Sequence, residues 1–125
     1  MNRRVTIALG ATALLYAASS AAVAQNAPPT YQADPSVYKI IFEDQNFRVI
    51  AATYKAGQTD QSHSHPVPSI AYALNDCTLR THAPDGKTRD IDVKIGIVNV
   101  VPMTPSHTTE NTGPKDCHVI FVERK

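Results

Sequence analysis

Residues 57–65 read GQTDQSHSH, and residues 96–111 read GIVNVVPMTPSHTTEN. In the first stretch one residue separates His63 from His65, so on a β-strand both imidazoles lie on the same face. The second stretch contains His107. If its strand runs beside the first, the third imidazole completes a metal-ligand triad. The two stretches therefore predict both β-structure and a three-histidine metal site.

Short segments with strand character, separated by turn signals, fill the chain from residue 35 onward. Residues 84–86 (Pro-Asp-Gly) are a strong hairpin signal, and residues 102–106 are expected to form a loop. We find no convincing amphipathic helix, so the pattern predicts an all-β sandwich or barrel. The predicted strands are 37–42, 47–55, 62–65, 70–74, 77–82, 88–93, 97–101, 107–111 and 117–123.

The histidine stretches resemble the two motifs of the cupin superfamily. Those motifs run G-x5-H-x-H-x(3,4)-E-x6-G and G-x5-P-x-G-x2-H-x3-N. The matching residues here are Gly57, His63 and His65 for the first motif, and Gly96, Pro102, His107 and Asn111 for the second. The resemblance spans residues 57–111. It implies a double-stranded β-helix, a jelly-roll cupin barrel with its site inside.

The chain departs from these motifs at three positions. The glutamate of the first motif falls at Ser69 or Ile70, its closing glycine falls near Asp76, and the glycine of the second motif is Thr104. The resemblance therefore implies a divalent transition metal held by the three histidines alone, with Fe, Mn, Zn, Ni and Cu as candidates. One hypothesis is that the Ser69 hydroxyl hydrogen-bonds a metal-bound water from the position of the glutamate.

Three further polar residues are assigned roles other than metal ligation. His82 precedes the predicted hairpin and His118 opens the last strand, and both are expected to be solvated or structural. Asn111 is expected to fix the turn after the histidine strand, because side-chain amides commonly cap turns.

Four other residues close to the motifs are also interpreted as non-ligands. Asp60 and Gln61 precede the first histidine and are expected to be solvated loop residues, although either could reach the mouth of the pocket. Tyr72 is expected to pack in the core rather than turn its hydroxyl into the pocket. Met103 is expected at the pocket rim or as a core filler.

The first 24 residues have the pattern of a secretory signal peptide. Arg3 and Arg4 form the positive region, residues 5–18 are apolar, and residues 22–24 (Ala-Val-Ala) form a cleavage site. The alternative is an uncleaved membrane anchor, but the apolar run is short for a span of about 20 residues. We therefore expect a periplasmic or secreted protein.

The rest of the chain is expected to contain a disordered leader and one domain. Residues 25–34 lack periodicity and contain two prolines, which predicts disorder, and residues 35–125 form the cupin domain. In an oxidising compartment Cys77 and Cys117 can pair, but the sequence alone does not give their separation, so two separate buried thiols stay open as the alternative.

The charge balance limits the expected partners. The whole chain has a formal net charge of +1, and removal of residues 1–24 with their two arginines changes it to −1. No basic patch for nucleic acid and no stable membrane span after cleavage are expected. A small-molecule ligand is the expected partner, and the resemblance also implies a homodimer formed through edge strands.

Three functions are compatible with these patterns. The first is an exported small cupin that binds a divalent metal through three histidines and acts as an oxygenase-type enzyme on a small molecule. The alternative is a non-catalytic small-ligand or metal-binding cupin module, favoured by the missing glutamate. The third is a structural jelly roll without metal, which the intact histidine set disfavours. Metal identity would help to separate the first two.

Overall fold

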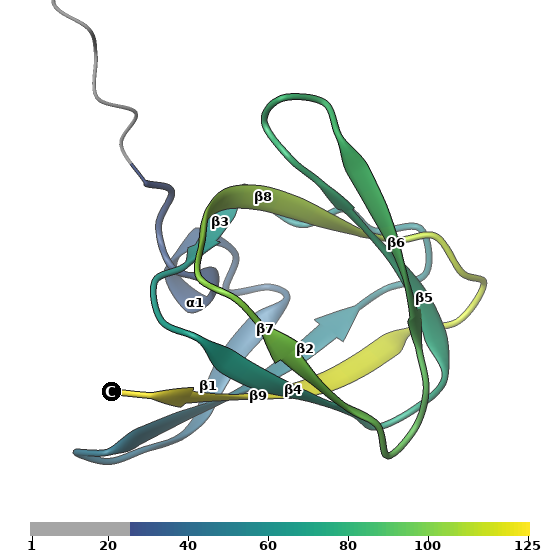
Figure 1. Ribbon diagram of the computed structural model, residues 1–125. Helices are drawn as coiled ribbons and strands as arrows, with labels where there is room; N and C mark the ends of the chain where they lie inside the picture. The colour runs from purple at the N-terminus through teal and green to yellow at the C-terminus, as the bar shows by residue number, and fades with distance from the viewer. Residues whose placement is uncertain (1–25) are drawn as a thin grey trace, which may run out of the picture.

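The computed structural model describes residues 26–125, which form nine strands and one short helix (Figure 1). Each strand pair is antiparallel. The elements are α1 (Thr30–Ala33), β1 (Tyr38–Glu43), β2 (Phe47–Tyr54), β3 (His63–His65), β4 (Ser69–Ala73), β5 (Cys77–His82), β6 (Thr88–Val93), β7 (Val98–Val101), β8 (Thr104–Asn111) and β9 (Cys117–Arg124). Within this part of the chain, no helix is long and apolar enough to cross a membrane.

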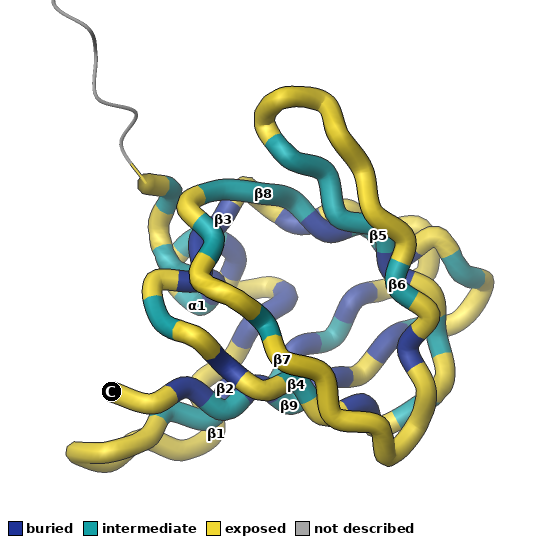
Figure 2. The backbone as a smooth tube through the Cα atoms, viewed as in Figure 1, coloured by how far each residue is buried: buried dark blue, intermediate teal, exposed yellow. Residues whose placement is uncertain are grey.

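The strands form two sheets that enclose a common interior. One sheet has the order β1-β2-β9-β4-β7 and the other has the order β3-β8-β5-β6. Buried residues line the inner faces while the outer faces stay exposed (Figure 2). This architecture confirms the predicted all-β class and the jelly-roll barrel.

The inner face of β9 shows how alternation builds the core. Cys117, Val119 and Phe121 are buried, whereas the residues between them are exposed or half-buried. Successive strand side chains point to opposite faces, so every second residue enters the interior. Leu79 and Val93 of the second sheet belong to the same core cluster, so the two sheets share one apolar interior.

The predicted loop at residues 102–106 is wrong in its second half. The strand that carries His107 begins at Thr104, because Thr104 pairs with His65 of β3 while the same strand pairs on its other side with β5. Proline is poorly suited to a central strand, since it has no backbone N–H. Pro105 is accommodated at the end of β8, where its carbonyl accepts a hydrogen bond from the Ala27 N–H at 3.0 Å.

The segment before residue 35 also differs from the sequence expectation of a disordered leader. Ser64 donates its backbone N–H to the carbonyl of Pro28 at 2.8 Å, and Pro29 bridges to Ser64. Thr30, the first residue of α1, is buried. Residues 26–34 are therefore ordered, because they cover the otherwise open edge of β3. The predicted signal peptide and Gln25 lie outside the described residues.

Cys77 and Cys117 form a disulfide with a Cα–Cα separation of 5.5 Å. The sequence had left this pairing open. Each cysteine is the first residue of its strand, β5 in one sheet and β9 in the other. The bond therefore ties the two sheets together.

Replacement of both cysteines by alanine should lower the free energy of unfolding by about 3–4 kcal/mol, because the bond closes a loop across a sequence separation of 40 residues. Urea denaturation followed by circular dichroism measures the change. Dithiothreitol should destabilise the wild type to a similar extent and leave the variant unaffected. Equal stability of wild type and variant without reductant would contradict this prediction.

Candidate metal centre

The three predicted histidines meet inside the barrel. β3 supplies His63 and His65, and β8 supplies His107, which lies directly opposite His63 in the register. The Nε2 atom of His107 lies 2.8 Å from Nε2 of His63 and 3.2 Å from Nε2 of His65. One potential ligand atom from each ring lies within 4.8 Å of the others. The arrangement has the compactness that one metal ion requires.

Burial keeps two of the imidazoles in the form that binds metal. Burial is the main cause that lowers the pKa of His65 to about 3, and the neighbouring His63 and His107 contribute to this shift. Burial and the neighbouring His63 likewise lower the pKa of His107 to about 4. Both rings are therefore neutral near pH 7, and metal ligation requires a neutral imidazole with a free lone pair.

A backbone contact fixes the orientation of His63. Its Nδ1 lies 3.0 Å from the carbonyl oxygen of Gln61, and a carbonyl only accepts, so Nδ1 carries the proton. The lone pair of this ring is then on Nε2, the atom that faces the other two imidazoles. Metal-ligating histidines commonly donate their second nitrogen in this way.

A buried carboxylate supports the same histidine from behind. Asp60 is only 4% exposed, and its carboxylate accepts the backbone N–H of Thr109 and the hydroxyl of Tyr38, both at 2.6 Å. One oxygen of this carboxylate lies 3.4 Å from Nδ1 of His63. Asp60 is therefore not the solvated loop residue expected from the sequence, because β1 and β8 enclose it.

The Tyr38 hydroxyl links this carboxylate to the histidine cluster. It lies 2.6 Å from the Tyr54 hydroxyl and 3.5 Å from Nε2 of His63. Burial is the main cause that raises the pKa of Tyr38, so its hydroxyl stays protonated. No sequence pattern marks Tyr38 as part of the site, because its place beside the histidines depends on strands distant in the chain.

Ser69, at the position of the cupin glutamate, is buried at the start of β4, and its hydroxyl has no hydrogen-bond partner among the described residues. Its contact with a metal-bound water stays a prediction. The buried Glu123 pairs with Ser69 in the register and does not stand free, because Arg48 lies 3.4 Å away. The carboxylate observed beside one of the three histidines is that of Asp60.

The remaining predictions near the motifs divide into two groups. Asn111 is fully buried, and its amide donates to the carbonyls of Tyr54 and Lys115 while its oxygen accepts from Gly113, so it fixes the turn as expected. Tyr72, by contrast, is 41% exposed on the outer face and is neither core nor pocket.

The two other histidines and Met103 lie outside the cluster. His82 lies 2.9 Å from Glu110, and His118 contacts Thr53 at 3.2 Å, as expected for structural or solvated residues. Met103 is largely exposed and does not fill the core.

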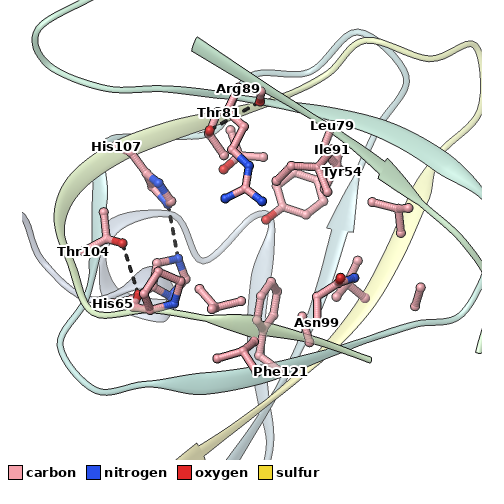
Figure 3. Close-up of a pocket in the computed structure, with 18 residues that line it drawn as sticks. Tyr54, His65, Leu79, Thr81, Arg89, Ile91, Asn99, Thr104, His107 and Phe121 are labelled. Atoms are coloured by element: carbon pink, nitrogen blue, oxygen red, sulfur yellow. Dashed lines mark hydrogen bonds between the residues drawn. The ribbon is translucent and has the colours of Figure 1, made fainter. Parts of the chain in front are cut away.

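A cavity of about 310 Å³ opens beside the histidine cluster (Figure 3). His65 and His107 form part of its wall. Most of the remaining wall is apolar, and its larger apolar residues are Leu79, Ile91, Val93, Val101, Val119 and Phe121. A ligand in this cavity would lie beside the metal site and against an apolar surface.

Solved structures of cupin domains are similar to this chain in fold. A cupin domain from Bordetella pertussis Tohama I matches with a TM-score of 0.66 at 15% sequence identity, over 71% of this chain and 92% of that one. The chain has the cupin fold. The resemblance inferred from the two motifs is thus confirmed at the level of the fold.

Two further structures share the cupin barrel. An RmlC-like cupin family protein from Methanocaldococcus jannaschii has a TM-score of 0.58 at 11% identity, over 70% of this chain and 78% of that one. The polyketide cyclase RemF from Streptomyces resistomycificus has a TM-score of 0.54 at 15% identity, over 70% of this chain and 63% of that one. No family model matches the sequence, and the search of curated proteins found no match either.

The buried carboxylate leads to a testable expectation. The Asp60→Asn variant keeps one acceptor oxygen for the Thr109 N–H, but it replaces the oxygen beside Tyr38 and His63 with an amide NH2 and loses the negative charge, so its dissociation constant for Zn²⁺ should rise about 10- to 100-fold. Competition with a chromophoric chelator measures this constant. The matched control is Asp85→Asn in the exposed hairpin, which should bind like the wild type. If Asp60→Asn unfolds like the wild type and binds Zn²⁺ equally well, the carboxylate has no influence on the site.

Proposed function

We propose that the protein binds one divalent transition metal through Nε2 of His63, His65 and His107. The observation that supports this most directly is the convergence of three imidazole nitrogens in a buried space. Two of these rings are neutral near pH 7, and the third has its Nε2 lone pair directed at the others. With the proton of each ring on Nδ1, all three Nε2 lone pairs would point into this space, so a cation is a chemically suitable occupant. Imidazole ligands fit Fe, Zn, Ni and Cu best, and Mn remains a candidate.

The finer proposal is an oxygenase-type enzyme that acts on a small molecule. Three protein ligands leave coordination positions for other groups, and the cavity lies beside them. A redox-active metal in such a site can supply dioxygen chemistry. The protein itself positions the ligand and excludes water with the apolar wall.

The competing proposal is a small-ligand or metal-binding module without catalysis. Among the described residues that line the cavity there is no aspartate, glutamate, lysine or cysteine. General acid–base chemistry in the cavity would therefore depend on the histidines, which are the proposed metal ligands, or on the Tyr54 hydroxyl. The cupin fold hosts a polyketide cyclase and also proteins described only by their fold, so the fold does not decide between the two proposals.

Export to the periplasm or the medium also remains a proposal. The signal-peptide pattern in residues 1–24 supports it. The Cys77–Cys117 disulfide agrees with it, because such bonds persist in oxidising compartments.

We also propose that the protein forms a homodimer through an edge strand. β1 and β7 are the edge strands of the larger sheet, and an unpaired edge can add a second copy.

Elemental mass spectrometry of the protein purified from a periplasm tests metal binding. We expect near-stoichiometric metal in the wild type and none in a His63→Ala/His107→Ala variant, since one remaining imidazole cannot hold the ion. A His82→Ala/His118→Ala variant is the matched control and should retain the metal. A wild type that is metal-free and also fails to take up added Zn²⁺, Fe²⁺ or Cu²⁺ would refute the proposal.

A further inference from the structure

One arginine reaches the cavity from β6, an edge strand of the four-stranded sheet. Arg89 lies on β6, where it pairs with Thr81 of β5, and both residues line the cavity. In the close-up, the Arg89 guanidinium points into the cavity rather than away from the barrel (Figure 3). It is the one side chain with a permanent charge among the described residues of the wall.

This guanidinium has no carboxylate partner within the part of the chain that the structure describes. Arg48 and Arg80, by contrast, each have an acidic partner. Arg48 lies 2.9 Å from Glu43, and Arg80, one strand away, lies 2.6 Å from Asp90. A guanidinium offers a planar fork of donors that matches a carboxylate in two hydrogen bonds. Arg89 is thus positioned to pair with an acid that comes from outside the chain.

The rest of the cavity indicates what such an acid would look like. Its larger apolar residues include Leu79, Ile91 and Phe121, and polar side chains such as Thr81 and Tyr54 also line the wall. The volume of about 310 Å³ is at the small end of the range for ligand pockets, which suits a compact molecule. A phosphate would be less suited, since phosphate sites usually offer a helix N-terminus or several cationic side chains, and the described residues of this wall include one guanidinium and no residue of α1.

The charges around the three histidines also favour an acidic ligand. The three imidazoles bring no negative charge into the site. Asp60 contacts His63 and is not among the described residues of the cavity wall. A divalent ion at the histidines and Arg89 would therefore both favour an anionic ligand.

We infer that the cavity binds a small carboxylic acid with an apolar or aromatic body, whose carboxylate pairs with Arg89 and whose body packs against Leu79, Ile91 and Phe121. The inference rests on the proposed function for the metal end of the cavity, while the Arg89 contact itself needs no metal. The inferred ligand class is the same whether the protein is an enzyme or a binding module.

Phenylacetate and its neutral isostere phenylacetamide are suitable probes, because they differ chiefly in charge. We would titrate each into the ¹⁵N-labelled, Zn²⁺-treated protein and follow amide shifts by NMR. Phenylacetate should bind about tenfold or more tightly than phenylacetamide, as expected for charge-assisted hydrogen bonds. Arg89→Gln should weaken this preference in the Zn²⁺-treated protein and abolish it where no metal is bound, and Arg89→Lys should retain part of it. Arg80→Gln is the matched control and should behave like the wild type.

A parallel titration in the His65→Ala/His107→Ala background separates Arg89 from the metal. An Arg89-dependent preference that persists there supports the inference. Absence of phenylacetate binding to the wild type, or a preference that Arg89→Gln leaves unchanged in this background, would overturn it. Metal content measured on the same samples keeps the two proposals apart. Wild type that binds metal but shows no Arg89-dependent preference refutes the ligand class alone, whereas the preference without metal uptake refutes the metal site alone.

Discussion

The antiparallel pairing of β3 with β8 is the constraint on which the site depends. It sets His63 opposite His107 and leaves His65 on the same face as His63, so three imidazoles from two strands share one buried space. A shift of one residue in either strand would turn its histidines to the other face. The segment before β1 bears on this pairing as well, because the carbonyl of Pro28 accepts the N–H of Ser64, between the two histidines.

The buried polar network around Asp60 is the second constraint on the site. A carboxylate in an apolar interior is costly unless it is well hydrogen-bonded, and Asp60 accepts from both Tyr38 and Thr109. These contacts hold a negative charge close to His63 although the chain lacks the glutamate of the cupin motif. In the proposed site the negative charge lies behind His63 instead of among the metal ligands, which would leave coordination positions on the cavity side free for a partner from outside.

The sequence predicted the elements whose cause is local. β5 and β6 begin and end where expected, because the Pro-Asp-Gly turn between them defines the hairpin and Gly86 adopts a positive φ of 85°. The histidine triad was also predictable, since period-2 alternation and motif spacing are properties of the sequence. The longer β8 and the ordered residues 26–34 were not, because both owe their structure to pairing with β3.

The residues that the sequence could not assign become functional only through tertiary contacts. Asp60 resembles a solvated loop residue until strands distant in the chain enclose it. Arg89 looks like any arginine near a hairpin, and only the closure of β6 over the barrel directs its guanidinium into the cavity. Sequence spacing reports on which residues share a face, whereas burial and the absence of a counter-ion depend on the assembled barrel.

X-ray absorption spectroscopy of the Zn²⁺-loaded protein tests the central claim most directly, because it reports the atoms bound to the metal. If His63, His65 and His107 bind the metal, the spectrum should show three imidazole nitrogens at about 2.0–2.1 Å from Zn²⁺, together with one light atom from solvent or ligand. The His107→Ala variant should lose the three-imidazole signature. A first shell with sulfur, or one with fewer than two imidazoles in the wild type, would contradict a metal centre built on β3 and β8.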